Sequence, residues 1–273
     1  MDFIPIEPHT LLKPYIEKMW VFKSSGKLPS DDFKLVVPNG NMKMTFTSVN
    51  GITATVGKNE ITSKEGIITL TGVIDIPVSI DTQKDLFTET IGIEFNPKGA
   101  FRFFRLNFGE IRNNIIELND ILGSSINQLE NEAANAETLT EKIKILQQFL
   151  IKELMQNTSD PVYEFCIDKI ISTKGKVSVK ELEKKTGYSS RWLNMKFSEN
   201  LGVSPKNLSS IIRFKECYEA FNSAILNNTV NNSYYEFYHD QSHFIKNFKH
   251  YTGLLPSGLD PNSNDFGRKY YKA

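Results

Sequence analysis

Short apolar runs alternate with turn residues in the first half of the chain, between Lys34 and Phe95. The runs are rich in Val, Ile, Thr and Phe, and the clearest are residues 42–47, 52–56, 67–70 and 90–95. The turn signals between them are Asn39-Gly40, Asn50-Gly51 and Gly66. This pattern predicts β-strands, and turns so closely spaced indicate a sandwich or a small barrel. Segments 11–22 and 99–104, on either side, fit a strand or a helix.

The pattern becomes helical after Leu118. Thr138 and Glu141 have the spacing of a capping box, in which the two side chains each accept a hydrogen bond from the other's backbone N–H. Apolar residues then recur at helical spacing, at Ile143, Leu146, Phe149, Leu150 and Leu154. They predict an amphipathic helix over residues 139–155. The polar segment 157–161 then predicts a linker, and residues 162–253 have a helical pattern.

These patterns predict an α+β protein with two domains. A mainly-β sandwich or small barrel, ending in the amphipathic helix, is expected over residues 1–157. An all-α domain is expected over residues 158–259, and residues 260–273 are expected to form a C-terminal tail. The length of 273 residues agrees with about two domains of ordinary size.

An internal repeat lies in the C-terminal part, where residues 189–205 and 240–256 align without gaps, 51 positions apart. Each copy begins with a helix-capping residue, Ser189 or Asp240, and ends in a glycine and a proline, which stop a helix. The other matched positions are Leu193 and Phe244, Phe197 and Phe248, Gly202 and Gly253, and Pro205 and Pro256. Two copies of one helical unit explain this pattern most simply.

A second helix is predicted before the first copy. Ser178 and Glu181 form a capping box, Leu182 lies on its apolar side, and Gly187 predicts a short turn before Ser189. Helix, short glycine turn and helix is the layout of a helix-turn-helix motif. Between the two copies, one connecting helix over residues 206–226 is predicted by Leu208, Ile211, Ile212, Tyr218, Phe221 and Ile225.

The second helix of the first unit has an apolar side and a polar side. At 100° per residue, Leu193, Phe197 and Leu201 face the core. The opposite side carries Arg191, Asn194, Met195 and Ser198. The matching positions in the second copy are Ser242, Ile245, Lys246 and Lys249, with Gln241 in the first turn. Such a face fits a DNA major groove, where Arg reads guanine and Asn reads adenine. In the alternative interpretation, both helices are walls of a bundle and their polar faces are solvated.

The second copy resembles the AraC family of bacterial transcription regulators. Residues 237–249, Phe-Tyr-His-Asp-Gln-Ser-His-Phe-Ile-Lys-Asn-Phe-Lys, followed by Gly253 and Pro256, match the second helix-turn-helix of that family in register. The resemblance covers roughly residues 162–259 and implies double-stranded DNA as a partner, with RNA polymerase as a second. Carried over by position, and with the neighbouring Ser190 and Lys249 added, the predicted DNA-binding residues are Ser190, Arg191, Asn194, Met195, Gln241, Ser242, Lys246 and Lys249.

The chain departs from the family pattern at three places. Met195 stands where the family often has a basic residue, and Phe237 stands at the usual turn glycine. The segment 231–236, the expected first helix of the second unit, lacks an apolar Ile-Ala pair. The departures favour a second interpretation, a protein-protein interaction module with degenerate DNA binding.

The N-terminal half resembles a cupin-like domain of unknown function that precedes some AraC-type modules. The matching stretches are residues 14–17 with Trp20, residues 37–40, and residues 91–104. This resemblance implies that the domain senses a small-molecule effector or mediates homodimer formation.

Charge agrees with a nucleic-acid partner for the C-terminal part. The whole chain has a formal net charge of zero, but residues 159–273 carry 16 Lys and Arg against 12 Asp and Glu. No apolar run reaches the ~18 residues that span a bilayer, and the first residues lack the pattern of a signal peptide. We therefore expect a cytoplasmic protein that does not contact a membrane.

The residues expected of an enzyme or a metal site are missing from the sequence. His9 is the one histidine of the β-rich half, whereas a metal-binding cupin uses two or three. His243 and His250 lie about two helical turns apart, too far to share one ion. Cys166 and Cys217 are isolated, and neither a phosphate loop nor a nucleophile motif is found. The sequence therefore predicts a non-enzyme without cofactor or metal.

Overall fold

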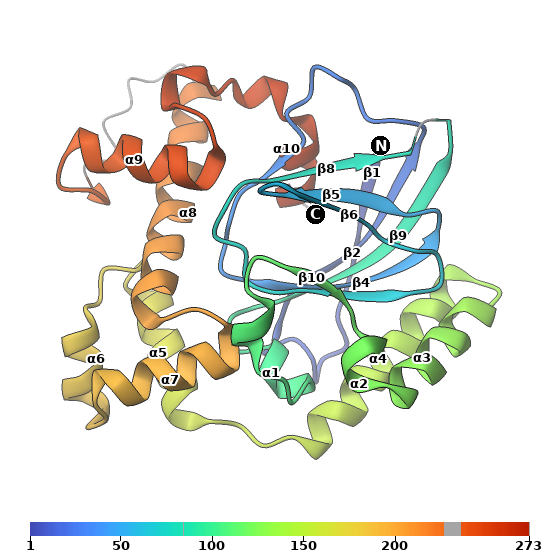
Figure 1. The fold of residues 1–273 in the computed structure, drawn as a ribbon, viewed down its shortest axis with the longest axis horizontal. Coiled ribbons are helices and arrows are strands. Elements are labelled where there is room, and N and C mark those ends of the chain that lie inside the picture. The colour runs from blue at the N-terminus through green and yellow to red at the C-terminus, as the bar shows by residue number, and fades with distance from the viewer. Residues whose placement is uncertain (84, 227–235, 273) are drawn as a thin grey trace.

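Two facing antiparallel sheets form the N-terminal half of the chain in a computed structural model, which describes residues 1–83, 85–226 and 236–272. Helices cover one sheet and form the C-terminal part (Figure 1). The strands in the described residues are β1 (Asp2–Ile6), β2 (Ile16–Ser25), β3 (Leu35–Val36), β4 (Met42–Val49), β5 (Ile52–Val56), β6 (Asn59–Thr62), β7 (Ile68–Thr71), β8 (Val78–Thr82), β9 (Phe87–Phe95) and β10 (Ile115–Glu117).

The helical elements follow mainly after the strands and confirm the predicted α+β class. In the same described residues they are α1 (Ala100–Phe103), η1 (Phe108–Ile111), α2 (Asn119–Leu122), α3 (Ser124–Asn135), α4 (Leu139–Gln156), α5 (Pro161–Ser172), α6 (Val179–Thr186), α7 (Ser190–Leu201), α8 (Pro205–Leu226), α9 (Gln241–Thr252), η3 (Pro256–Gly258), η4 (Pro261–Ser263) and α10 (Asp265–Lys272). Among these described helices, none combines the length and the hydropathy needed to cross a bilayer.

The larger sheet has the strand order β1-β2-β9-β4-β7-β10, and the smaller one β3-β8-β5-β6. Side chains alternate between the two faces of a strand. On β4, Met42, Met44 and Phe46 belong to the main core shared with the helices, whereas Lys43 and Thr45 line the space between the sheets. The larger sheet is therefore apolar toward the helices, and toward the smaller sheet it carries both polar and aromatic side chains.

The structure confirms the strands predicted from the apolar runs and decides the two ambiguous segments. Residues 16–25 form β2, which pairs along its whole length with β9. Residues 100–103 form the short helix α1, which brings Phe103 and Phe104 against Phe95 at ring-centroid distances of 5.2 and 5.9 Å. The capping box of α4 is present, because Glu141 N–H donates to Thr138 Oγ1 at 3.2 Å.

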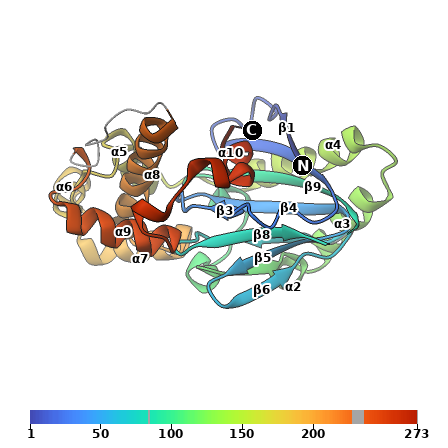
Figure 2. The same ribbon diagram turned by 90° about the horizontal axis from the view of Figure 1, so that it is seen from above.

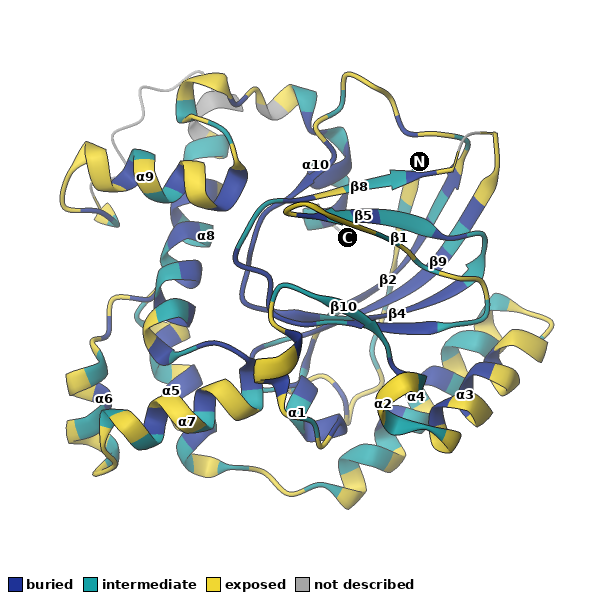
Figure 3. Cartoon of the chain, in the orientation of Figure 1, coloured by how far each residue is buried: buried dark blue, intermediate teal, exposed yellow. Residues whose placement is uncertain are grey.

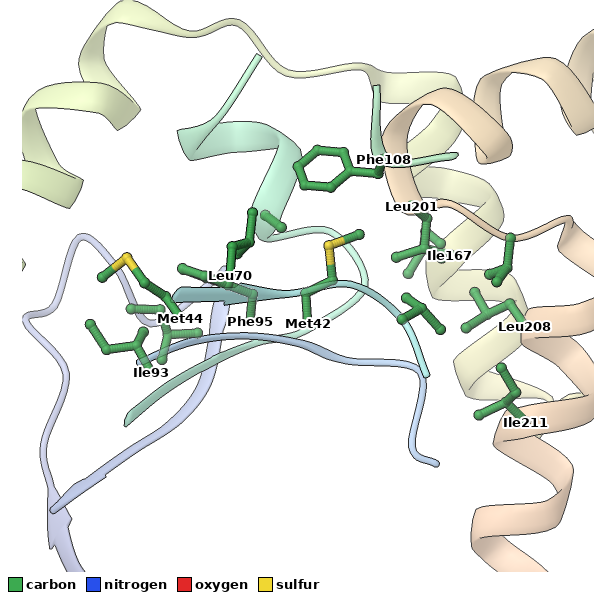
Figure 4. Close-up of a cluster of buried hydrophobic side chains, with 14 of the residues drawn as sticks. Met42, Met44, Leu70, Ile93, Phe95, Phe108, Ile167, Leu201, Leu208 and Ile211 are labelled. Atoms are coloured by element: carbon green, nitrogen blue, oxygen red, sulfur yellow. The ribbon is translucent and has the colours of Figure 1, made fainter. Parts of the chain in front are cut away.

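One buried apolar cluster runs from the larger sheet into the helical part (Figure 4). Phe108 of η1 lies beside Leu201 of α7 in this cluster, and Met42 lies toward Ile167 of α5. The Tyr163 hydroxyl also crosses the boundary, since it donates to the Pro97 carbonyl at 2.6 Å. The expected linker lies between α4 and α5, but the core continues past it.

Residues 260–273, which we expected to form a C-terminal tail, contain η4 and α10. Helix α10 returns to the N-terminal half (Figure 2). It packs against β1 and β3, which are edge strands of the two sheets. Asn264 fixes its start, accepting from Leu35 N–H at 2.9 Å and donating to the Leu35 carbonyl at 3.0 Å. Phe266 and Tyr270, one helical turn apart, are buried against the sheets, which explains why this segment is a docked helix.

Candidate nucleic-acid interface

The first helix-turn-helix unit consists of α6 and α7. Ser178 and Glu181 form the capping box of α6, with Ser178 N–H donating to Glu181 at 2.8 Å. Gly187 ends α6 at a φ of 76°, a left-handed conformation that glycine adopts without strain. Ser189 then caps α7 by accepting from Trp192 N–H at 3.3 Å. Each residue of the turn thus has the role that the sequence pattern predicts.

The two sides of α7 are those expected from its periodicity (Figure 3). Leu193, Phe197 and Leu201 are buried in the main core. Arg191 and Asn194 are exposed, and Met195 is 47% exposed, which is high for a large apolar side chain. Ser190 is partly buried, and its backbone N–H donates to the Glu183 carboxylate. Toward the end of α7, Ser198 is also exposed, and its Oγ lies close to Gly109 of η1.

Helix α8 connects the two units as one uninterrupted element of 22 residues. At 1.5 Å per residue its length is about 33 Å. It begins at Pro205, three positions after Gly202, whose backbone lies so close to Phe108 that an added Cβ would be 2.5 Å from the Phe108 carbonyl oxygen. Ser204 caps its first turn, accepting from Asn207 N–H at 3.1 Å. This agrees with the predicted connector over residues 206–226.

The second copy of the repeat is α9, which lies across the other end of α8 from α7 (Figure 1). Asp240 caps it by accepting from His243 N–H at 2.8 Å, and Gly253 ends it at a φ of 76°. Phe244 and Phe248 are buried against Phe221 of α8, and their ring centroids lie 5.9 and 5.4 Å from the centroid of the Phe221 ring. The predicted site residues of this copy are all exposed, namely Gln241, Ser242, Lys246 and Lys249.

The structure therefore brings the predicted residues onto two helix faces at separate positions along one connector, not into a single pocket. The helix expected over 231–236 falls largely on residues 227–235, outside the described residues. Tyr238, which follows, is buried at 5% exposure and packs on His243 with a centroid distance of 5.1 Å. This contact fixes the entry to α9.

A groove of about 480 Å³ lies between α9 and the β-rich half. Lys246, His250 and Tyr251 line it from α9, and Arg112 with Asp75 line it from the loops of the β-rich half. Arg112 forms an ion pair with Asp75. Burial, and then the charge of Asp75, raises the pKa of Tyr251 to about 12, so its hydroxyl stays protonated. The groove presents several hydrogen-bond donors beside the exposed face of α9.

Comparison with known families adds one match for the N-terminal half. Residues 5–117 match a domain family of unknown function, DUF6597, which covers less than half of the chain and names no ligand. No curated protein matches the chain significantly.

Solved structures with a similar chain path include two of ToxT from Vibrio cholerae. An apo form is 14% identical, over 88% of this chain and 95% of that chain, with a TM-score of 0.46. A form bound to an unsaturated fatty acid is 14% identical, over 92% and 95%, with a TM-score of 0.42. The cupin domain of Cnp3 from Schizosaccharomyces pombe is 12% identical, over 34% and 63%, with a TM-score of 0.28. At these values the matches assign neither a ligand nor a partner to this chain.

Two groups of residues beside the predicted faces were not found from the sequence. Tyr188 stacks on Trp192 at a centroid distance of 4.1 Å, which makes a flat aromatic surface at the start of α7. Arg112 and Asn113 reach the groove at α9 from a loop more than 120 positions earlier in the chain. The i, i+4 spacing of Tyr188 and Trp192 is a local signal, whereas nothing in the sequence near Arg112 indicates α9 as a neighbour.

The two cysteines are buried residues of the core. Among the described residues, no three His, Cys, Asp or Glu side chains are grouped to hold a metal ion. Cys166 and Cys217 are buried, and burial raises their thiol pKa values to about 11 and about 12. A thiol with so high a pKa is a poor nucleophile at neutral pH, so both cysteines act as small core residues.

Proposed function

We propose that this chain is a sequence-specific DNA-binding transcription regulator of the AraC type, whose β-rich half senses an effector or mediates dimerisation. The observation that carries the proposal is the pair α7 and α9. The two helices have the same kind of cap, the same glycine end and the same buried positions, and both direct exposed polar side chains outward. A bundle whose helices only support one another has no need for this repetition.

The chemistry of the exposed faces suits DNA. Arg191 and Asn194 carry donors and acceptors that pair with guanine and adenine edges in the major groove. On α9, Gln241 and Lys246 have the same capacity, and Lys249 supplies a charge for a phosphate. The N-terminal turn of each helix adds its dipole, which favours a nearby phosphate.

Selection from a random double-stranded DNA pool with the full chain tests the proposal. We expect enrichment of one motif and an affinity that falls with rising salt, because bound Lys and Arg release counterions from DNA. Lys246→Ala should weaken binding to the selected motif, while Lys144→Ala, an exposed lysine on α4, should not. A pool without any enriched motif, together with an affinity independent of salt, would refute the proposal and favour the protein-interaction module.

A further inference from the structure

A cavity of about 100 Å³ lies between the two sheets. Its wall on the smaller sheet is aliphatic and includes Ile52, Ala54 and Ile80. Its wall on the larger sheet is aromatic and polar and includes Trp20, Lys43, Thr45 and Thr69. Protein cores are packed without voids much larger than a water molecule, so a space of this size with a mixed lining is not an ordinary core.

Unsatisfied polar atoms gather on this inner face of the larger sheet. Trp20 lines the cavity at 4% exposure, and its indole N–H has no hydrogen-bond partner among the described residues. The same holds for the buried hydroxyls of Thr47 and Thr90, which are paired in register on neighbouring strands β4 and β9. Buried polar groups are normally paired, so the unpaired Trp20 N–H on the cavity wall indicates that a polar molecule enters this space.

One end of the inner face is charged. Glu94 of β9 lies in register between Lys18 of β2 and Lys43 of β4. Asn39 and Asn41 donate to its Oε1 at 2.5 and 2.7 Å, and the Tyr270 hydroxyl of α10 donates to its Oε2. The Glu94 carboxylate is therefore an acceptor that a hydroxyl group entering from the side of α10 satisfies.

Helix α10 supplies that hydroxyl and closes the space between the edge strands β1 and β3. Phe266 and Tyr270 both line the cavity and pack on Phe3, with ring centroids 5.4 and 5.7 Å from it. Tyr270 also packs on Trp20 at 6.0 Å. The C-terminal helix thus places a phenol, the end of a tyrosine, into an aromatic site with a carboxylate at its end.

The remaining space is too small for a second phenol beside Tyr270. A cavity of about 150 Å³ holds one benzene ring, and the space that remains here is smaller, about 100 Å³. A molecule that places a ring and a hydroxyl on the same contacts must displace the Tyr270 side chain. Lys18 would lose its contact with the Tyr270 ring, at 3.9 Å, in the same step.

We propose that the cavity between the sheets binds a small phenol-type molecule, an aromatic ring with a hydroxyl donor, and that Tyr270 and Phe266 of α10 are its internal competitors. Binding releases α10 from the edge strands. Residues 253–264 connect α9 to α10, so release also frees one attachment of the second helix-turn-helix unit. This inference rests on the effector-sensing part of the proposed function. Its tests contain no DNA, so a failure of phenol binding is distinguished from a failure of DNA binding.

The first test is calorimetric titration of the full chain with 4-ethylphenol, with ethylbenzene as the analogue that lacks the hydroxyl. Removing the competitor in Tyr270→Ala should tighten 4-ethylphenol binding by about tenfold or more, because apparent affinity rises with the fraction of open sites. Lys272→Ala, an exposed residue of the same helix, should leave it unchanged. Ala54→Leu, which fills the cavity, should abolish it. A Tyr270→Ala affinity equal to that of the wild type overturns the proposal.

The second test follows α10 itself by hydrogen exchange of residues 265–272 in the wild-type chain, so it does not depend on the folding of a variant. Saturating 4-ethylphenol should accelerate this exchange, and ethylbenzene should do so less, because it offers no donor to Glu94. Unchanged or slower exchange of α10 overturns the proposal. Tyr270→Phe, which keeps the ring and removes the donor, should show faster exchange without any ligand.

Discussion

At the scale of single residues, Arg191 is the clearest test of base reading, because it is exposed on the first turns of α7 next to Asn194. Arg191→Ala should cost about 1–3 kcal/mol of binding free energy on the selected motif and relax the preference at one base pair. Competition titrations with motif variants at each position measure both effects. An equal loss on all sequences would assign Arg191 to a phosphate and contradict base reading.

Glu94 predicts a dependence of stability on pH. Burial alone raises the pKa of its carboxyl, but the charges of Lys43 and Lys18 and the hydrogen bonds from Tyr270 and Asn41 together hold the pKa below its ordinary value of 4.5. A carboxyl with a lowered pKa in the folded state stabilises the fold fully above the unfolded pKa, and this contribution is lost as pH falls through the folded pKa.

Urea unfolding of the wild type and of Glu94→Gln between pH 3 and 7 measures this contribution. The variant should be less stable at pH 7, because Lys18 and Lys43 lose their buried counter-charge, and the difference should shrink below about pH 4.5. Glu137→Gln, an exposed residue, should match the wild type throughout. A difference that stays constant with pH would show that Glu94 does not act through its charge.

Residue roles were predictable from the sequence where they depend on local spacing. Leu193 and Phe197 are buried and Arg191 is exposed because helical periodicity alone separates them. The contact of Glu94 with Tyr270 was not predictable, since Tyr270 lies 176 positions away and reaches it only through the return of α10. A local signal for α10 was present in Phe266 and Tyr270, one turn apart, but it indicates an apolar side without indicating its partner.

At the scale of elements, the strands were predictable from short runs of β-branched residues. Their side chains alternate between a face covered by helices and a face directed at the other sheet. The segment 11–22 was ambiguous because its apolar residues fit both periods, and pairing with β9 decides it. The segment 99–104 becomes α1 because Phe103 and Phe104 pack on Phe95, a contact across the end of a strand. Tertiary packing, which no local pattern contains, made both choices.

Helix α8 predicts the spacing of the DNA sub-sites. If α7 and α9 both enter major grooves on one side of B-DNA, the sub-sites lie about one helical turn apart, roughly 34 Å or 10 base pairs. One protein chain should then protect two sub-sites in a non-palindromic arrangement. Inserting about five base pairs between them should remove most of the specific affinity, because the second groove rotates away. A full-turn insertion of about ten should also fail, because α8 cannot lengthen.

Gel-shift titrations with the spaced sites measure this prediction, and Lys246→Ala separates its outcomes. Affinity that survives the half-turn insertion, with no further loss in Lys246→Ala, would mean that α9 does not contact DNA. Affinity that survives the insertion but falls in Lys246→Ala would mean that the connection between α7 and α9 is flexible, contrary to the uninterrupted α8.

At the scale of the whole molecule, the β-rich half is joined to the helical part by more than the chain connection between α4 and α5. The main core continues through Tyr163 and Phe108, and α10 closes the chain back onto β1 and β3. The sequence predicted two domains and a linker because it shows only where the pattern changes. It does not show that Gly202 lies against the Phe108 backbone, a contact between segments on opposite sides of that linker.

A shared core predicts that both parts unfold together. The chain has two tryptophans, Trp20 in the β-rich half and Trp192 in α7, so Trp20→Phe and Trp192→Phe each leave one fluorescent reporter. The two variants should report the same transition width, and in each background Phe108→Ala should lower the thermal midpoint by the same amount. Phe108 is fully buried, and its truncation costs about 3–5 kcal/mol, which corresponds to roughly 10 °C in a chain of this size. A midpoint that falls only for the Trp20 reporter would contradict the shared core and show that the helical part folds independently.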